Sequence, residues 1–357
     1  MKGTVMADNN KKKFTPLSLA ETSAFCSQIG MILRAGISSS EGISIMLDDT
    51  KDEGEKKLLS AINDTLQATG SLYMSLEETG AFPDYMVTMV QIGEQTGKLD
   101  DVMISLSEYY EKESTLADSI RSAVTYPCIM ILMMVGVILL LMMKVLPIFG
   151  QVYSQLGTSM NGLTRVIIGI GVFLNKNWLI TVIILAALIA VAIYFFATAK
   201  GRGTFMGLTS KFSSQKKLTE DISSYRFASG MALTLSSGLT PEESLRLTAG
   251  LIDKGPFREK VDACIEKVSA GEDLCDSLLS CGLFSGLYTR MTSIAARTGA
   301  MDEVMAKIAA RREEEIDSRI SGMLAAIEPT LVIVLSVIVG VILLSVMLPL
   351  INIMTAL

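Results

Sequence analysis

Histidine is absent from this sequence of 357 residues. Its absence excludes the Ser-His-Asp triad, the Cys-His pair, the HExxH zinc site and imidazole acid–base catalysis. Cysteine is scarce, and no CxxC spacing occurs among Cys26, Cys128, Cys264, Cys275 and Cys281. We interpret these five as apolar thiols rather than as disulfides or metal ligands. The sequence therefore predicts no catalytic residue, no cofactor and no metal site, and we expect a protein that is not an enzyme.

Charge is nearly missing from two long apolar runs. Pro127–Pro147 contains one charged side chain, Lys144, and Pro329–Pro349 contains none. Each run is about 20 residues, long enough to cross the hydrocarbon layer of a bilayer as a helix. A third uncharged run, Trp178–Ala199, begins at an aromatic residue of the kind that anchors spans at the interface. Half of the residues are hydrophobic, and we predict an all-α integral membrane protein with three transmembrane helices.

The predicted spans also lack the groups that membrane chemistry and transport require. The apolar runs Pro127–Pro147, Trp178–Ala199 and Pro329–Pro349 contain no Asp, Glu or Arg, and Lys144 can snorkel to the outer surface. Carriers, pumps and proton relays usually hold ionisable groups at mid-membrane, and an aspartyl intramembrane protease needs two such carboxylates. This pattern disfavours these classes. A membrane-anchored signalling scaffold and a transporter component remain as alternatives.

The sequence contains an internal repeat. The prolines that bound the two end runs are 202 positions apart, and the same shift superimposes Phe25 on Phe227, Gly36 on Gly238 and Glu41 on Glu243. Further identities under this shift are Gly80 with Gly282, Phe82 with Phe284, Gly97 with Gly299, and Asp100 with Asp302. Glycines and aromatic residues of this kind fix turns and core anchors, so both halves should share one fold.

Apolar periodicity predicts a bundle of about six helices in each half. In the first half the expected helices are Ser18–Arg34, Ser40–Asp48, Glu53–Ala68, Leu72–Glu78, Pro83–Gln95 and Leu99–Thr125. Pro127 is expected to kink or restart the last of these where it meets the membrane. A shorter apolar segment, Leu163–Leu174, is expected to lie on the membrane surface as a helix.

These features divide the chain into eight segments. We expect a disordered tail at 1–13 with no cleavable signal peptide, because this tail is polar and basic. The other predicted segments are helical repeat 1 (14–125), spans at 126–148, 178–199 and 328–351, an extracytoplasmic loop at 149–177, helical repeat 2 (200–327), and an extracytoplasmic C-terminus at 352–357.

Basic residues near the span ends predict the orientation. Lys200, Arg202, Lys211, Lys216 and Lys217 follow the middle span, whereas the loop between the first two spans holds only two basic residues. Cytoplasmic flanks are enriched in Lys and Arg. We therefore expect the N-terminus and both repeats in the cytoplasm, and the C-terminus outside.

Charge also distinguishes the repeats. Repeat 1, over 14–125, has 7 basic and 18 acidic residues, a net charge of −11, whereas repeat 2 has 17 of each. The acidic surface is either a solvated face or a docking face for a basic protein partner. Its sign disfavours nucleic acid.

The densest polar motif is GEQTGKLDD, from Gly93 to Asp101. It is not a phosphate-binding P-loop, because three residues rather than four separate the glycines and Leu99 follows Lys98. A helix corner with capping carboxylates is the favoured interpretation, and cation binding by Glu94, Asp100 and Asp101 stays open. Repeat 2 has Ala296 in place of Glu94, so the role of this glutamate is confined to one repeat or to an interface.

Two charged runs precede the end spans, EKESTLADSIR at Glu111–Arg121 and RREEEIDSR at Arg311–Arg319. Solvated helix faces with i,i+4 pairs are the first interpretation. The alternative is contact with a partner that moves the attached span.

Several motifs resemble the type II secretion system F domain family, the inner-membrane platform proteins of type IV pilus and type II secretion machines. FCSQIGMILRAGISSSEGI at Phe25–Ile43 is similar to the family's opening helix and turn. FPDYMVTMVQIGEQTGKLDDVM at Phe82–Met103 resembles its most recognisable motif, and AVTYP and LPIF resemble its first membrane boundary. FASGMALTLSSGLTPEESL and IEPTLVIVL, in the second half, resemble the matching parts.

The resemblance implies a plasma (inner) membrane platform without enzymatic activity. Its implied partners are a hexameric assembly ATPase, pilins or pseudopilins, other inner-membrane machine proteins, further copies of the chain, and lipid, but no nucleic acid. Motion of the ATPase would reach the membrane through the bundles and help to extract pilin subunits. The candidate structural and interaction positions are Gly36, Phe82, Gly93, Glu94, Gly97, Asp100, Pro127, Pro147, Gly238, Gly299, Asp302, Pro329 and Pro349.

Overall fold

The computed structural model describes residues 14–145, 213–284 and 286–356, and the single positions 147, 148, 151, 169, 173 and 176. Most of these residues are helical, and none of them is in a strand. The expected tail at 1–13 and the expected span at Trp178–Ala199 lie outside the described residues, and so does nearly all of the expected surface helix at Leu163–Leu174.

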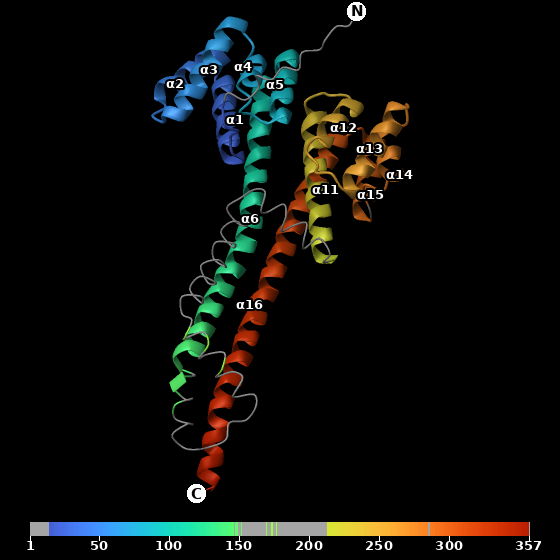
Figure 1. Ribbon diagram of the computed structural model, residues 1–357. Coiled ribbons are helices and arrows are strands. Elements are labelled where there is room, and N and C mark those ends of the chain that lie inside the picture. Colours follow the sequence, from blue (N-terminus) through green and yellow to red (C-terminus); the bar gives the residue numbers. More distant parts are fainter. Residues whose placement is uncertain are drawn as a thin grey trace, which may run out of the picture. The chain divides into compact units, whose positions relative to one another are not determined.

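Repeat 1 is a helical bundle whose short helices gather along the first part of a long one (Figure 1). The helices are α1 (Leu19–Arg34), α2 (Ser39–Asp49), α3 (Glu53–Thr69), α4 (Leu72–Thr79), α5 (Asp84–Thr96) and α6 (Leu99–Leu140), followed by a π-helical turn at Leu141–Val145. The first five agree with the sequence prediction to within one residue at each end.

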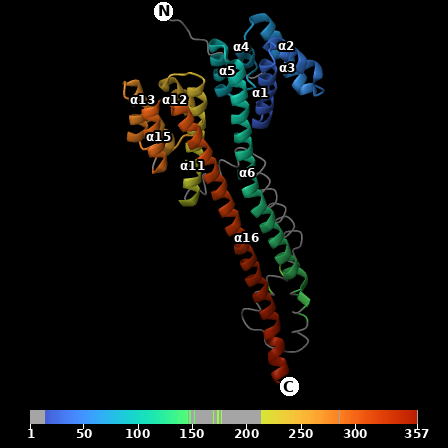
Figure 2. The same cartoon turned by 180° about the vertical axis from the view of Figure 1, so that it is seen from behind.

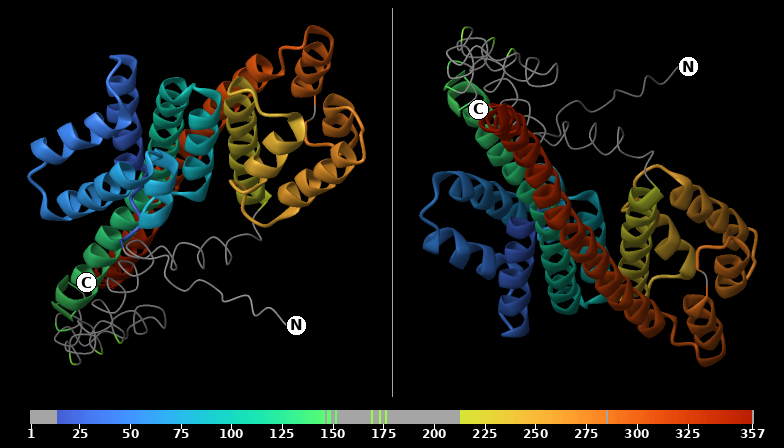
Figure 3. Two further views of the ribbon diagram at one scale, coloured as in Figure 1. Left: turned by 90° about the horizontal axis from the view of Figure 1, so that it is seen from above. Right: turned by 90° about the horizontal axis from the view of Figure 1, so that it is seen from below.

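Repeat 2 has the same order of elements, seen from behind in Figure 2. Its helices are α11 (Ser213–Ser236), α12 (Pro241–Ala249), α13 (Pro256–Ser269), α14 (Leu274–Ser280), α15 (Leu287–Thr298) and α16 (Met301–Ala356). Seen from above, α1–α3 form one group of helices in blue, and α12–α15 form another in yellow to orange (Figure 3). The expectation of two helical repeats of one fold is confirmed.

Matching caps set the helix ends in the two repeats. The Ser38 hydroxyl accepts from the backbone N–H of Glu41 at the start of α2, and Thr240 accepts from Glu243 at the start of α12. Each bond satisfies an N–H that has no partner inside the helix. A glycine with positive φ follows α5 and α15, Gly97 at 69° and Gly299 at 71°. An L side chain is strained in this conformation, which explains why glycine occupies both positions.

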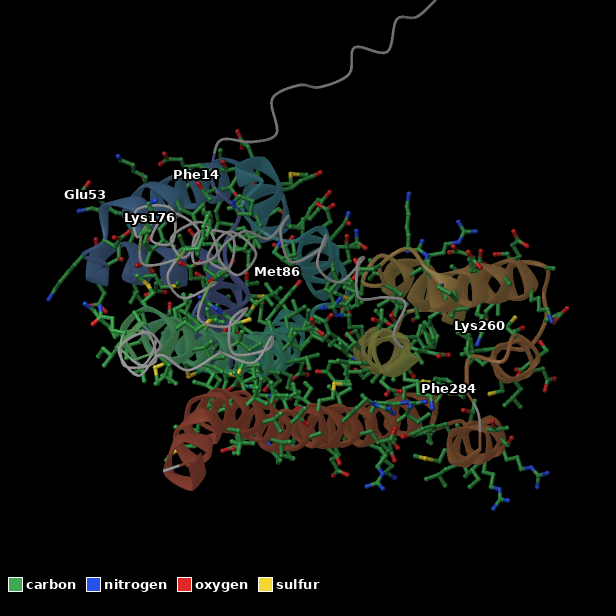
Figure 4. The ribbon with its side chains drawn as sticks, turned by 60° about the horizontal axis from the view of Figure 1, so that its bottom comes forward. Phe14, Glu53, Met86, Lys176, Lys260 and Phe284 are labelled. Atoms are coloured by element: carbon green, nitrogen blue, oxygen red, sulfur yellow. The ribbon has the colours of Figure 1, made fainter. Side chains whose placement is uncertain are left out.

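Equivalent aromatic pairs lie in the two cores. The Phe25 and Phe82 ring centroids are 4.8 Å apart in repeat 1, and those of Phe227 and Phe284 are 6.0 Å apart in repeat 2. All four side chains are buried. Figure 4 marks Met86 in repeat 1 and Phe284 in repeat 2, and Met86 is fully buried. The first helix of each repeat is thus packed against the segment that leads into its fifth helix.

The last helix of repeat 1 corrects part of the prediction at Pro127. Helix α6 neither ends nor restarts there but continues through the proline to Leu140, and a kink at Pro127 stays a prediction. Proline removes one backbone hydrogen bond, yet it is tolerated inside transmembrane helices where local adjustment satisfies the freed groups. Helix α16 likewise continues through Pro329 and Pro349 to Ala356.

Two helices in the described part of the chain are long and apolar enough to cross a membrane. They are the segments Leu99–Val145 and Met301–Leu344, and their most apolar windows are 0% and 6% buried. Such surface needs lipid or protein around it, which supports a membrane location. The chain divides into two compact units, and the first contains the bundle parts of both repeats, up to Ala117 and over Lys217–Ile316.

Candidate functional site at the helix corners and the repeat junction

The α5–α6 corner is built around a close approach of two helices. Gly93 is buried, and a Cβ atom there would lie 3.1 Å from the Leu99 Cα and 3.2 Å from the Val102 Cβ. The N–H of Lys98 donates to the Gly93 carbonyl at 3.0 Å, which closes the turn at Gly97. The sequence motif therefore forms a tight helix corner.

Acidic residues begin the helix after this corner. Asp100 and Asp101 lie in the first turn of α6, and Asp302 lies in the first turn of α16. Carboxylates are favourable at this end of a helix because of its dipole. Asp101 also pairs with Arg34, at 3.4 Å, where the end of α1 meets α6.

Glu94 caps a neighbouring helix. Its carboxylate accepts hydrogen bonds from the Ser71 hydroxyl, at 2.7 Å, and from the backbone N–H of Leu72, at the start of α4. In repeat 2 the position equivalent to Ser71 is Asp273, which accepts from the N–H groups of Cys275 and Asp276 at 2.8 and 3.3 Å. Each repeat thus places one carboxylate at this helix start, which explains why repeat 2 has no glutamate at position 296.

The remaining candidate positions lie at separate places in the fold. Gly36 and Gly238 follow the first helix of each repeat with φ of 80° and 91°, and Phe82 is 6% exposed in the core. Pro127 and Pro329 lie inside the two long helices, Pro349 lies near the end of α16, and Pro147 follows the π-helical turn. These positions do not converge on one chemical site.

A buried ion pair joins the two repeats, and it is absent from the sequence-based candidates. The Arg226 Nε lies 3.2 and 3.0 Å from the two carboxylate oxygens of Glu113, and its Nη2 lies 2.9 Å from Oε2. Glu113 is 5% exposed, so the first interpretation of its charged run as a solvated face is wrong at this residue. A second carboxylate, Asp253, lies 3.5 Å from Arg226 Nη1.

Tyrosines surround this pair. Tyr85 packs against Tyr109 at a tilt, and Tyr109 packs edge-to-face against Tyr110, with ring centroids 5.6 and 5.1 Å apart. The Tyr85 hydroxyl donates to the Gly230 carbonyl at 3.5 Å. Burial opposes the charge of Arg226, but the Glu113 carboxylate outweighs it and raises the pKa of the guanidinium. Burial, reinforced by Glu113, raises the pKa of Tyr109 well above its ordinary value. The junction is therefore a layer of uncharged tyrosines around the charged pair of Glu113 and Arg226.

One signal in the sequence could have revealed Glu113. Leu106, Tyr109, Tyr110, Glu113 and Leu116 follow the spacing of a single buried helix face. A carboxylate within such a face needs a cationic partner, because burying an unpaired charge is strongly unfavourable. The repeat-equivalent residue Glu315 instead accepts from Tyr288, at 2.7 Å, and from Arg312, at 3.0 Å, within repeat 2.

Comparison with known proteins places the chain in a family. The family profile described as "Type II secretion system (T2SS), protein F" matches residues 25–147 and again 227–349, two copies that are 202 residues apart. The chain belongs to the type II secretion system protein F family.

Similar proteins in this family come from both pilus and secretion machines. The type IV pilus assembly protein PilC of Thermus thermophilus is 30% identical, over 94% of this chain and 83% of its own length. PilC of Pseudomonas aeruginosa is 25% identical, over 95% and 90%. The type II secretion system protein F of Xanthomonas campestris pv. campestris is also 25% identical, over 97% and 85%. The resemblance to this family is therefore confirmed along nearly the whole chain.

Proposed function

We propose that this chain is a non-enzymatic membrane platform of a type IV pilus or type II secretion-like machine. The observation that carries the proposal is the continuity of α6 and α16, each of which begins in a folded bundle and continues without a break into an apolar segment. A continuous helix can transmit a displacement of the bundle to the membrane. The names of the similar proteins supply the kind of machine.

The proposed topology has three spans. Both repeats and the N-terminus lie in the cytoplasm, residues 149–177 form an extracytoplasmic loop, and the C-terminus lies outside. The basic residues after the middle span support this orientation, because cytoplasmic flanks are enriched in Lys and Arg. Reaction of a membrane-impermeant thiol reagent with a cysteine introduced at Asn161, in the proposed outer loop, would test the arrangement.

The proposed partners are a cytoplasmic assembly ATPase and pilins or pseudopilins. Repeat 1 has a net charge of −11 and repeat 2 of zero, so a basic surface of the ATPase would meet repeat 1 first. Its movement would displace the bundles and, through α6 and α16, help to extract subunits from the bilayer into a filament.

Deletion of the gene provides the first test. We expect filaments or secretion to be lost while pilin synthesis and ATPase activity persist. Normal assembly in the deletion strain would contradict the proposal.

A sharper test breaks the mechanical link in α6. Four glycines inserted after Ala117 should interrupt the helix between bundle and membrane, whereas four alanines add the same length and keep it helical. We expect filament assembly to fall much further with glycine than with alanine at equal protein levels. Equal assembly by the two variants would contradict transmission through α6.

A further inference from the structure

An open groove of about 560 Å³, lined by both apolar and polar side chains, lies on repeat 1 beside α1 and α2. Two of its lining residues, Met31 and Ile45, are 58% and 46% exposed. Two acidic side chains, Asp49 and Glu55, and one basic side chain, Lys51, line it as well. Large apolar side chains rimmed by charge on a water-facing bundle are typical of an interaction surface.

A second open apolar face lies on α15 of repeat 2. Leu287 and Ile294 are 60% and 58% exposed, and their spacing of seven residues places them on the same side of the helix. Arg290 and Arg297 are exposed and lie on that side too. This face therefore combines apolar side chains with two positive charges, whereas the groove combines them with two negative charges and one positive charge, a net of −1.

The contact between the repeats of one chain shows how such faces fit together. The hydroxyl of Tyr85, on α5, reaches the carbonyl of Gly230, on α11. Leu233, also on α11, belongs to the buried cluster of repeat 1, and Leu247 and Leu251 pack against that cluster. The fifth helix of repeat 1 and the first two helices of repeat 2 thus take part in one apolar interface.

The shift of 202 residues maps this internal interface onto the two open faces. Gly230, Leu233, Leu247 and Leu251 correspond to Gln28, Met31, Ile45 and Asp49, and all four of these line the groove. Tyr85 and Ile92, on α5, correspond to Leu287 and Ile294 on α15. The chain therefore carries two copies of the surfaces that form this interface. One copy is used between its own repeats, and the other copy is the pair of exposed faces.

We propose that these faces bind each other between two copies of the chain. Helix α15 of one copy occupies the α1–α2 groove of the next copy, and this contact repeats the joint between the two repeats. The two surfaces differ, so the contact is head-to-tail and generates a ring or an open chain rather than a two-fold dimer.

Charge supports this occupant of the groove. Arg290 and Arg297 correspond to Thr88 and Gln95 in repeat 1, and Asp49 and Glu55 correspond to Leu251 and Phe257 in repeat 2. The two basic residues of α15 and the two acidic residues of the groove thus stand where the corresponding residues of the other repeat are uncharged. The pattern reverses at Lys51 in the groove, since repeat 2 has Asp253 at the equivalent position. Complementary charge of this kind sets the register of a contact and the choice of partner.

The contact between copies is weaker than the internal one. Ala24 stands where repeat 2 has Arg226, so the buried pair with glutamate is not repeated. Inside the chain Lys112 pairs with Glu313 at 3.4 Å. In the contact between copies the equivalent residues are Glu314 of one copy and Glu111 of the next, which are both acidic and form no pair. The joint between copies therefore depends more on its rim charges and should weaken as salt rises.

Cysteine crosslinking in native membranes tests this contact without any filament assay, so its failure would leave the platform function untouched. Two full-length variants carrying different tags, Ile45→Cys and Ile294→Cys, are expressed together, with Cys128 and Cys281 replaced by serine. A short bis-maleimide should give a crosslinked dimer that carries both tags, and neither variant alone should give one. Lys112→Cys with Glu313→Cys in one chain is the positive control, because this pair joins the repeats internally.

A charge swap provides the second measurement. Arg297→Glu should lower the mixed crosslink by about tenfold or more, Asp49→Arg together with Arg297→Glu should restore it, and Lys307→Glu should leave it unchanged. Two results would overturn the proposal. One is the absence of a mixed crosslink while the internal control reacts, and the other is crosslinking by Ile45→Cys or Ile294→Cys alone.

Discussion

The repeat junction should be destabilised more by removing Arg226 from its buried ion pair than by removing Glu113. Arg226→Met leaves the Glu113 carboxylate, which is 5% exposed, without the guanidinium that donates to it. Removing one partner of a buried pair costs about 3–5 kcal/mol, because the other charge stays buried and unpaired. We expect the full effect here.

The reverse substitution should cost less. After Glu113→Leu, Arg226 retains a side chain that is 29% exposed and keeps Asp253 at 3.5 Å. We expect about 1–3 kcal/mol, since water and Asp253 compensate part of the lost contact. The double variant replaces the pair with apolar side chains and should lie within about 1 kcal/mol of the wild type.

Hydrogen exchange on the full-length protein in detergent measures this difference. The relevant amides are those of α11 and of α6 around Glu113, where opening of the junction exposes backbone groups. At roughly tenfold per 1.4 kcal/mol, Arg226→Met should accelerate their exchange by about two to three and a half orders of magnitude. The amides of α3, which lies outside the junction, serve as the internal control.

Two outcomes would refute this reasoning. If both single variants exchanged at wild-type rates, the pair would contribute nothing to holding the repeats together. If the double variant were less stable than either single variant, packing of the two side chains rather than their charge would be the main contribution.

Four further predictions test the local structure. Gly93→Val should destabilise repeat 1 by about 1–3 kcal/mol, measured by thermal unfolding, because its side chain would meet the α6 backbone at 3.1 Å. Glu94→Gln should weaken the start of α4 by about 1 kcal/mol, and faster exchange of its first amides would reveal this. Burial raises the pKa of Cys264 to about 12, so maleimide should label it at neutral pH only after unfolding. Hydrogen bonds from the Ser18 hydroxyl and N–H lower the pKa of Glu21 from 4.5, so its capping contribution should be lost as the pH falls below that value, and Glu21→Gln should remove this pH dependence.

The sequence predicts helices well where their ends are locally determined. Ser38, Gly97 and Gly299 act on their own backbone or on residues within one turn, so their roles can be read from neighbouring positions. The end of the last helix in repeat 1 was predicted wrongly, because the local rule for Pro127 does not include the membrane setting that tolerates proline in a helix.

The functional positions are less predictable because their partners are distant in sequence. Glu94 caps a helix that begins 22 residues earlier, and Glu113 pairs with an arginine 113 residues later. The composition of the charged run around Glu113 indicates a solvated surface, whereas its spacing relative to Tyr109 and Leu116 indicates burial. Where the two signals disagree, the spacing is the better guide, because it reports which side of the helix a residue occupies.

The duplication also explains why the charged residues of this joint differ between the inside of the chain and its open faces. A repeated fold brings two copies of each interface, and one copy of the joint between α5 and α11–α12 is used inside the chain. The Glu113–Arg226 pair exists only at this internal joint, since Ala24 replaces the arginine at the equivalent position. The open faces instead carry Arg297 and Asp49, which are exposed. An exposed charge pair forms a weaker and more salt-dependent contact than a buried one. In the proposed platform such a contact between copies can open during movement, while the buried pair keeps the two repeats of each chain together.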